Sequence, residues 1–523
     1  MRAETESDFA GPAMWTVALA TLAVHLAVAG RYDFFRNELY FIICGRHPDF
    51  GYVDQPSLVP LLAAATQMAG ENLWLLRLPA ALAAAALVPV TAAIARLLGG
   101  GARAAWMAGL ASAIAPALIA LTTTLGTPTL EPLGWTLCGY LVLRAAMREE
   151  PRMLIWAGAV AGLSLANKYG IAIWLVGLCL GMALSPARRL LATRHFRTGL
   201  VIAILIGAPS LVWQALHGWP FLAIVRHHSI EGRIFAGPLP QFLIGQALAM
   251  NIALAPLWIA GLIAPFFREE LKPARILSIA ALVTFAAIVL AHGKNYYLFP
   301  IYPSLFAIGA ATLERFQEKW APVFRPEPRP NIERLNRWLA GAWMALAFIL
   351  SLIVFPVVLP IFSPGHLERF LARTHLAPRP EEAAAIGAPI TQIFSDQFGW
   401  RALAGKVAEV WRALPPDQRA HAAILASNYG EAAAIDFYGH GLPPALSGQN
   451  QYYLWGPRGA DGRAVILVNA NPARWRGLCG SLLPMGRFGN RYAMPYEKDR
   501  PILLCRNLRP SLATLWPRLM RFQ

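Results

Sequence analysis

Long apolar runs separated by short polar and basic segments dominate the first 362 residues of the chain. A run of roughly 17–25 mostly apolar residues can cross the hydrocarbon core of a bilayer as an α-helix. The pattern therefore predicts a polytopic α-helical membrane protein with about eleven transmembrane helices. These helices are expected near residues 13–30, 78–98, 104–121, 130–146, 154–168, 169–184, 200–215, 240–264, 276–291, 298–313 and 338–361.

Lys and Arg are concentrated in alternate loops between the predicted helices. Short cytoplasmic loops collect these residues, whereas loops on the other side do not. With a cytoplasmic N-terminus, an odd number of helices places everything after Ile361 outside the cytoplasm, and the charge bias agrees. The basic clusters are Arg96 with Arg103, Arg144 with Arg148 and Arg152, and the segments 188–197, 268–275 and 315–337.

One apolar stretch, residues 57–70, is too short to span a bilayer comfortably. Counting it as a span would invert every later loop and place the basic clusters outside. We therefore expect a helix that lies at the outer membrane interface, within a first outer loop of residues 31–77.

The composition changes at about residue 363, where Asp, Asn, Gln and Gly return and short apolar runs suit buried strands. This predicts two domains: a transmembrane domain, 1–362, and an extracytoplasmic α/β domain, 363–523. An outside location permits a disulfide between Cys479 and Cys505, the two cysteines of the second domain. The alternative is a pair of free, buried thiols.

The composition narrows the function classes. The chain has 523 residues, of which 56% are hydrophobic and 14% are charged, and its formal net charge is +17. In a polytopic protein such an excess of Lys and Arg indicates loop anchoring rather than nucleic-acid binding. The sequence contains no Walker loop, Rossmann glycine pattern, nucleophile elbow or CxxC spacing. Soluble nucleotide-sugar chemistry and a structural zinc site are therefore not supported.

Carboxylates near the predicted outer ends of helices are candidates for proton transfer. Glu38 and Asp54 lie in the first outer loop among aromatic residues, where each is either a general base or a solvated charge. Glu131 lies at the mouth of an apolar helix, where an unpaired carboxylate is costly, and it should have a partner. Lys168 interrupts two apolar runs and is either a snorkelling anchor or a cation for an anionic head group.

A second group of polar residues follows a later apolar run. Lys294, Tyr296 and Tyr297 combine one ammonium with phenols at the expected outer edge of the bilayer, which suits a lipid phosphate. The alternative is a basic exception to the loop rule with interfacial tyrosines. His217 and Trp219 are most simply interpreted as part of a turn with an interfacial tryptophan.

Ten short motifs follow one another along the chain: Arg36-Asn37-Glu38-Leu39-Tyr40, Gly51-Tyr52-Val53-Asp54-Gln55-Pro56, Glu131-Pro132, Asn167-Lys168, His217-Gly218-Trp219-Pro220, Lys294-Asn295-Tyr296-Tyr297, Asn428-Tyr429-Gly430-Glu431-Ala432, Asp436-Phe437-Tyr438-Gly439, Ser447-Gly448-Gln449-Asn450 and Met494-Pro495-Tyr496-Glu497. Taken in this order, they resemble the bacterial family-39 glycosyltransferases, which are similar to protein O-mannosyltransferases and the aminoarabinose transferase of lipid A. The resemblance covers most of the chain.

The resemblance implies a GT-C fold and an inverting transfer of a sugar from a polyprenyl-phosphate donor to an envelope lipid, glycan or protein. The reaction would occur on the outer face of the bacterial cytoplasmic membrane, with no covalent sugar intermediate. By this resemblance Lys294, Tyr296, Tyr297 and Lys168 would face the donor phosphate. The same comparison implies a substrate cavity with Glu131, His217 and Trp219.

One departure from the family pattern concerns the base. The family usually has Asp-Glu in the first outer loop, whereas this chain has Asn37-Glu38. An amide cannot accept a proton as a carboxylate does, so either Glu38 or Asp54 is the base, or Asn37 only orients the acceptor, or the protein is a catalytically weakened binding member. A lipid-linked-sugar flippase is a further alternative, although transporters usually place binding groups near the membrane midplane. No cofactor is required; a divalent metal is an option where carboxylates and His217 converge.

Overall fold

The computed structural model describes residues 12–235, 238–323, 330–378 and 385–523, without the side chains of residues 12, 231–235 and 315–337. The chain packs as two compact units, each described by itself below. The helical unit comprises Met1–Ala29, Arg77–Pro209 and Gly232–Ile361; the sheet unit comprises Gly30–Leu76, Ser210–Glu231 and Phe362–Gln523. The domain boundary expected at residue 362 stays a prediction.

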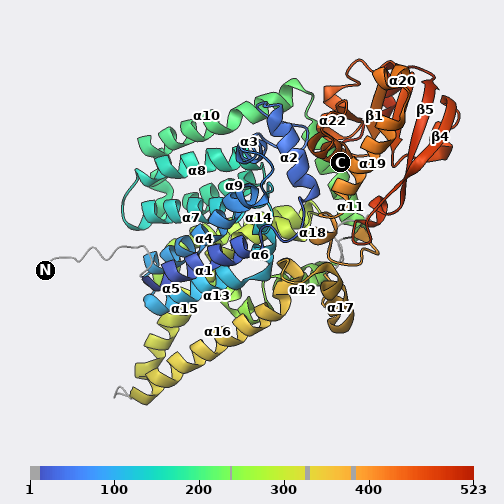
Figure 1. Ribbon diagram of the computed structural model, residues 1–523. Coiled ribbons are helices and arrows are strands. Elements are labelled where there is room, and N and C mark those ends of the chain that lie inside the picture. The colour runs from blue at the N-terminus through green and yellow to red at the C-terminus, as the bar shows by residue number, and fades with distance from the viewer. Residues whose placement is uncertain (1–11, 236–237, 324–329, 379–384) are drawn as a thin grey trace. The chain divides into compact units, whose positions relative to one another are not determined.

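Each predicted apolar run coincides with helical structure (Figure 1). Turns at Gly and Pro separate the helices, which are otherwise rich in Ala, Leu and Ile. The α-helices are α1 (Pro12–Val28), α4 (Leu73–Leu97), α5 (Ala102–Ile114), α6 (Pro116–Thr122), α7 (Glu131–Met147), α8 (Met153–Asn167), α9 (Ile171–Ala183), α10 (Arg194–Leu216), α12 (Leu239–Ala249), α13 (Ala255–Phe267), α14 (Arg275–Leu290), α15 (Tyr302–Val323) and α16 (Pro330–Val358), with 3₁₀ segments η1 (Pro186–Ala192), η2 (Ile252–Leu254), η3 (Glu269–Ala274) and η4 (Asn295–Ile301).

The number of membrane crossings is a separate question from the number of helices. Within the described residues, five helices are individually long and apolar enough to span a membrane, or up to eight if each bent pair is one span. The bends are 58° between α5 and α6, 115° between α9 and η1, and 98° between α12 and the following helical segment. Pro116 begins α6. Because proline has no N–H, it cannot continue the backbone hydrogen bonds of α5. The expected count of about eleven spans is therefore not confirmed, and the basic cluster at 315–337 lies outside the described side chains.

Small residues allow the helices of this unit to pack at close range. A Cβ atom on Gly158 would lie 2.0 Å from the carbonyl oxygen of Gly199, which places the backbones of α8 and α10 in contact. Gly261 of α13 approaches Leu305 of α15 in the same way. Such contacts are typical of helix association in membranes, where apolar side chains gain little by leaving lipid.

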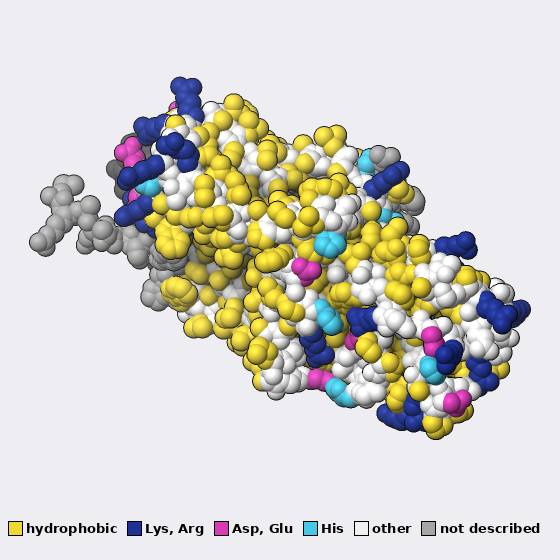
Figure 2. Space-filling model, turned by 90° about the horizontal axis from the view of Figure 1, so that it is seen from above, with side chains coloured by type: hydrophobic (Ala, Val, Ile, Leu, Met, Phe, Trp, Pro, Cys, Tyr) yellow, Lys and Arg dark blue, Asp and Glu magenta, His cyan; other side chains and the backbone are white. Residues whose placement is uncertain are grey.

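Aliphatic side chains remain exposed on the outside of the helical unit. Broad hydrophobic areas are visible in Figure 2. The central part of α10 exposes Leu200, Val201, Ile204 and Leu205. Contiguous apolar surface of this kind is rare on soluble proteins and fits contact with lipid.

The sheet unit is built on five strands in the order β2-β1-β3-β5-β4 (Figure 1). Strands β2, β1 and β3 are parallel, and β5 is antiparallel to both β3 and β4. All five residues of β1 and of β3 are buried, as expected for parallel strands covered on both faces. The strands are β1 (Ala422–Ala426), β2 (Ala445–Ser447), β3 (Ala464–Val468), β4 (Cys479–Phe488) and β5 (Arg500–Leu508). The expected small C-terminal α/β fold is confirmed.

Helices from distant parts of the chain cover this sheet. α19 and α21 contact its strands, and α2 of the first loop packs against both α21 and α3. Residues of α24 join Val465 and Leu467 in one apolar cluster. The helices of the unit are α2 (Arg36–Arg46), α3 (Leu58–Thr66), α11 (Pro220–Phe235), α17 (Pro364–Thr374), α18 (Gln392–Ser395), α19 (Trp400–Ala413), α20 (Pro416–Ala420), α21 (Tyr429–Tyr438), α22 (Asn450–Trp455), α23 (Pro472–Trp475), α24 (Leu512–Leu519) and the 3₁₀ segment η6 (Pro495–Glu497).

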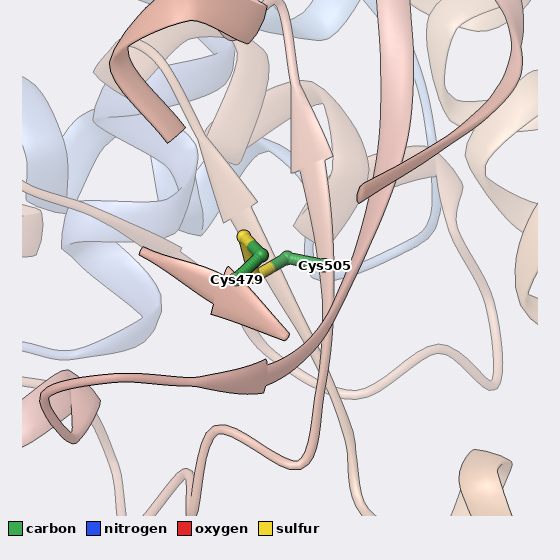
Figure 3. The surroundings of a disulfide bond; sticks show 2 residues. All are labelled: Cys479 and Cys505. Carbon is green, nitrogen blue, oxygen red and sulfur yellow. A yellow bond between two sulfur atoms is a disulfide. The ribbon is translucent and has the colours of Figure 1, made fainter. Parts of the chain in front are cut away.

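A disulfide joins the two antiparallel strands at the sheet edge. Cys479 at the start of β4 is bonded to Cys505 of β5, with their Cα atoms 5.4 Å apart (Figure 3). Cys505 is fully buried and belongs to the apolar cluster beneath α24. The bond therefore ties the outer strand to the core of the unit.

Candidate active site

The first outer loop is part of the fold of the sheet unit. The Tyr32 hydroxyl donates to the carbonyl of Phe362, and the backbone N–H of Arg36 donates to the carbonyl of Asp396. Tyr32 also packs edge-on against Phe394. These contacts hold the start of α2, which carries the candidate residues Asn37 and Glu38.

Asp54 lies in a tight turn, held by a hydrogen bond from the Tyr52 N–H to the Gln55 carbonyl. The Tyr40 hydroxyl donates to Asp54 Oδ1 at 2.8 Å, and Asn450 Nδ2 lies 3.5 Å from Oδ2. Burial raises the pKa of Asp54 to about 6, against the opposing effect of the Tyr40 hydrogen bond. Because the residue keeps some exposure, this carboxylate can accept a proton from a bound group near neutral pH.

Glu38 has a different environment. Its side chain is 0% exposed, and Oε2 accepts a hydrogen bond from the Phe35 backbone N–H at 2.8 Å. Glu38 thus occupies the third position of α2 and caps the helix start, as the glutamate of a capping box does. Helix capping alone therefore explains why a glutamate stands at position 38, and no catalytic role is needed.

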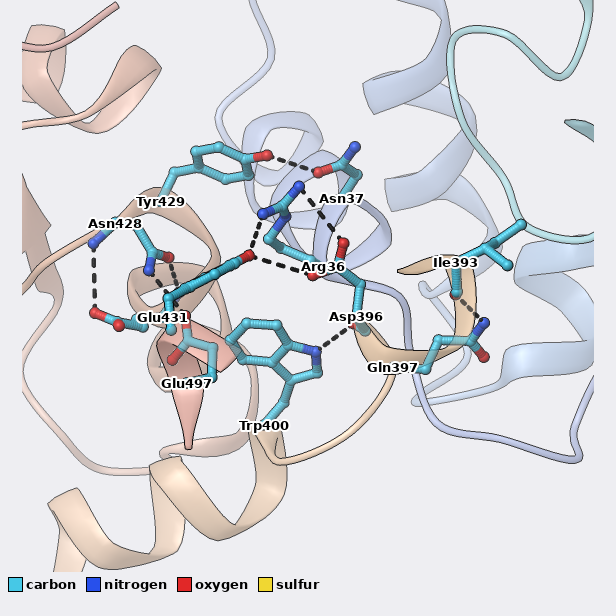
Figure 4. A network of polar contacts seen from close by, with 11 residues as sticks. Arg36, Asn37, Ile393, Asp396, Gln397, Trp400, Asn428, Tyr429, Glu431 and Glu497 are labelled. Atoms are coloured by element: carbon cyan, nitrogen blue, oxygen red, sulfur yellow. Dashed lines mark hydrogen bonds and ion pairs between the residues drawn. The ribbon is translucent and has the colours of Figure 1, made fainter. Parts of the chain in front are cut away.

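Asn37 and Arg36 enter a polar network with the C-terminal part of the unit (Figure 4). The Tyr429 hydroxyl donates to Asn37 Oδ1 at 2.8 Å. The Arg36 guanidinium lies 3.6 Å from a carboxylate oxygen of Asp396, hydrogen-bonds to the Tyr496 hydroxyl, and sits 5.5 Å from the centroid of the Tyr429 ring. Asn37 is therefore held as a hydrogen-bond acceptor in a fixed orientation.

A pair of buried carboxyl groups lies in the same network. Glu431 accepts hydrogen bonds from the Ser427 N–H and from Asn469 Nδ2, and Glu497 accepts one from Asn428 Nδ2. Burial raises the pKa of Glu431 to about 7, and burial together with the neighbouring carboxylate raises that of Glu497 further. Each carboxyl therefore holds its proton to a higher pH than an exposed glutamate does.

Sequence reasoning gave no role to this pair, although both residues lie in the quoted motifs. The sequence feature that could have indicated Glu431 is a helix-capping pattern. Asn428 followed by Glu431 is a capping-box spacing, and Asn428 does accept the Glu431 N–H at the start of α21. Asp396 and Asn469, the other partners in the network, were missed, because neither stands in a recognisable motif.

His217 and Trp219 lie in the turn between α10 and α11, and both are exposed. His217 stacks on Trp213 with ring centroids 3.9 Å apart, and its Nδ1 hydrogen-bonds to the Trp213 carbonyl. Trp213 in turn donates its indole N–H to Asp49. His217 therefore completes a helix end, which agrees with the simpler interpretation of the motif as a turn.

The helical unit contains the other candidate cluster. Lys168 Nζ lies 2.7 Å from Glu131 Oε2, with 18% and 5% of the respective side-chain surfaces exposed. The same ammonium sits 5.3 Å and 4.8 Å from the ring centroids of Tyr296 and Tyr297. Glu131 thus has the partner that its position requires, and one cation contacts both tyrosines.

Local backbone structure explains how Lys168 reaches this place. α8 ends at Asn167, whose side-chain amide donates to the Thr127 carbonyl, and Lys168 adopts an extended conformation before α9 begins. Lys294 occupies the residue before η4, directly ahead of the two tyrosines, and is partly exposed. Breaks in helices therefore position both lysines.

The option of a divalent metal at converging carboxylates finds no support in the described part of the chain. No group of three or more His, Cys, Asp or Glu residues there is arranged to hold a metal ion. His217, the histidine considered for such a site, is committed to Trp213.

Comparisons with known proteins agree with this architecture. The sequence profile of the dolichyl-phosphate-mannose-protein mannosyltransferase family matches residues 54–213, a segment that contains Asp54, Glu131 and Lys168. No curated protein has a significantly similar sequence.

Solved structures of ArnT from Cupriavidus metallidurans have a similar fold. The form bound to undecaprenyl phosphate has a TM-score of 0.56 and 15% identity, covering 94% of this chain and 98% of that chain. The apo form has a TM-score of 0.57 and 15% identity, covering 94% and 97%. The resemblance indicated by the sequence motifs is thus confirmed in its fold: the chain has the fold of ArnT, with apolar helices long enough to span a membrane.

Proposed function

We propose that the protein is an inverting glycosyltransferase that moves a sugar from a polyprenyl-phosphate donor to a cell-envelope acceptor. The carrying observation is Asp54, a partly exposed carboxylate with a pKa raised to about 6 and held by a phenol and an amide. The fold shared with ArnT, which has been solved with undecaprenyl phosphate, supports a lipid-phosphate donor.

We assign the general base to Asp54 rather than to Glu38. A base must be reachable by the proton that it accepts and must have a pKa near the working pH. Glu38 is fully buried and caps α2. Asn37, fixed by Tyr429, is assigned to orienting the acceptor.

We assign donor-phosphate binding to Lys168, with Tyr296, Tyr297 and Lys294. A phosphate oxygen that approaches Lys168 would share its ammonium with Glu131, while the phenols supply neutral donors. Such cations act most strongly on the leaving group, because its charge grows as the glycosidic bond breaks.

The proposed step is a single displacement. The acceptor oxygen attacks the anomeric carbon and loses its proton to the Asp54 carboxylate. The bond between the anomeric carbon and the phosphate oxygen breaks, and the electron pair leaves with polyprenyl phosphate. Configuration inverts, and no covalent sugar–enzyme intermediate forms.

The same proposal places the reaction on the outer face of the cytoplasmic membrane, with a cytoplasmic N-terminus and an extracytoplasmic C-terminal domain. Its support is the loop charge bias in the sequence and the disulfide between Cys479 and Cys505, since disulfides persist in oxidising compartments. The sugar is either a hexose or a pentose.

The decisive experiment uses purified protein in nanodiscs with a panel of polyprenyl-phosphate sugars and membrane-extract acceptors. Mass spectrometry follows sugar transfer and polyprenyl-phosphate release. Transfer by the native protein and its loss in Asp54→Asn supports the proposal. Donor binding without turnover, beside an active relative in the same assay, would instead support a binding member, which Asn37 would explain; Asn37→Asp then tests whether activity returns.

A further inference from the structure

A pocket lined by arginines lies within the sheet unit, formed entirely by residues of the C-terminal segment. It encloses about 240 Å³, several times the roughly 30 Å³ that one water molecule occupies in the liquid. A sugar-phosphate group is of suitable size for this space. The polar lining residues are Ser427, Asn469, Asn471, Arg474, Arg518 and Arg521.

The pocket lies at the carboxyl ends of two neighbouring parallel strands. Ser427 directly follows β1, and Asn469 directly follows β3. From β1 the chain proceeds to β2 on one side, whereas β3 is followed by strands on the other side of the sheet. Crevices at such a switch point are the usual ligand sites of open α/β sheets.

The residues that line the pocket carry a net positive charge. The lining contains three arginines and no carboxylate. In the described part of the chain, Arg474, Arg518 and Arg521 form no ion pair, and the Arg521 guanidinium donates to the carbonyl of Ser427. Burial and the nearby Arg474 lower the pKa of Arg521, and the carboxyl of Glu431 only partly opposes this effect. An anion in the pocket would relieve that repulsion.

We propose that this pocket binds a phosphomonoester group carried by a sugar, in a second anion site that uses none of the residues assigned to the polyprenyl-phosphate donor. Guanidinium groups recognise phosphate oxygens with paired N–H donors, and Asn471 adds a polar side chain to the lining. The phosphomonoester belongs either to a soluble sugar phosphate or to a lipid head group, two sources with the same chemistry.

The test measures binding of glucose 1-phosphate to the full-length protein in phosphatidylcholine nanodiscs by isothermal titration calorimetry. The double variant Arg474→Gln/Arg518→Gln is expected to weaken binding by about tenfold or more, since hydrogen bonds to charged groups are among the strongest. Arg476→Gln is the matched control, because Arg476 is an exposed arginine on the same segment that does not line the pocket. Equal affinity in the native and double-variant proteins would overturn the proposal.

A second variant tests the site further, and nanodiscs with an anionic lipid distinguish a lipid head group from a soluble sugar phosphate. Asn471 caps α23 with its side-chain oxygen, and aspartate caps equally well, so Asn471→Asp adds a negative charge without loss of the cap. It should weaken binding. If glucose 1-phosphate does not bind, nanodiscs containing phosphatidic acid test the lipid source by thermal stabilisation. Stabilisation that disappears in the double variant supports the site, and the absence of both signals refutes it.

Discussion

Two of the candidate carboxylates, one in each unit, have different surroundings. Glu131 in the helical unit contacts an ammonium at 2.7 Å, whereas Asp54 in the sheet unit is held by a phenol and an amide. An ammonium attracts a buried carboxylate more strongly than a neutral donor does, and the donors beside Asp54 only partly offset the cost of its burial. Asp54 therefore keeps a pKa near 6, where a carboxylate can both take and release a proton.

The difference indicates a division of roles. In the helical unit, one lysine that can balance a phosphate contacts a carboxylate and two tyrosine rings. The sheet unit holds hydrogen-bond networks that orient groups, and its buried carboxyls Glu431 and Glu497 have raised pKa values. The proposal thus assigns phosphate binding to the helical unit and proton transfer to the sheet unit. Mutations in each unit test this division.

The largest effect is expected from Asp54→Asn. An amide of the same shape can still accept from Tyr40 but cannot take up the proton, so kcat should fall by about 10²–10⁴-fold. Glu38→Gln is the matched control and should retain most of the activity with some loss of stability. The comparison fails if transfer rates show full activity in Asp54→Asn and loss in Glu38→Gln.

Lys168→Met should be the next most damaging change. It leaves Glu131 buried without its cation, a situation that typically destabilises a protein by about 3–5 kcal/mol. The double variant Lys168→Met/Glu131→Gln should regain thermal stability but not affinity for a polyprenyl-phosphate donor. Recovery of donor binding in the double variant would remove Lys168 from the phosphate site.

The disulfide offers a test confined to the sheet unit. Replacing Cys479 and Cys505 by serine should cost about 2–4 kcal/mol, because the unfolded chain loses its cross-link. Thermal unfolding with and without reductant measures the effect, and the double variant should be insensitive to reductant. Thiol labelling of the native exported protein should find neither cysteine before reduction; free thiols there would exclude the disulfide.

The positions of the helices could be predicted because an apolar run long enough to span a membrane has few other stable arrangements. Their membrane crossings could not, since Pro116 and similar breaks bend paired segments and shorten the pieces. The strands β1 and β3 were visible as short apolar runs for the related reason that both of their faces are buried.

The candidate site was less predictable, because its contacts join distant parts of the chain. Tyr40 donates to Asp54, but it also accepts from the backbone of Gln451, and Asn37 is bound by Tyr429. No local pattern indicates these pairs. The choice between Glu38 and Asp54 depended on burial and capping, which only the folded loop defines.

The buried carboxyls Glu431 and Glu497 of the sheet unit predict a smaller effect, which concerns stability. Between pH 4.5 and about 7 the native Glu431 holds a proton that the unfolded chain has released, so stability should fall as pH rises through this range. Glu431→Gln should flatten that slope, as measured by chemical unfolding of the protein at several pH values. An unchanged slope would mean that other groups control the pH dependence.

The smallest effect should come from Tyr40→Phe, which tests whether Asp54 is the group that limits the rate at low pH. Activity should rise through an apparent pKa near 6 as Asp54 deprotonates. The Tyr40 hydroxyl stabilises the carboxylate, so its removal should raise the pKa of Asp54 and move this limb of the pH–rate profile to higher pH. The rate well above the limb should change little. Glu38→Gln should leave the limb in place. A limb that stays fixed in Tyr40→Phe would mean that Asp54 is not the group that limits the rate at low pH.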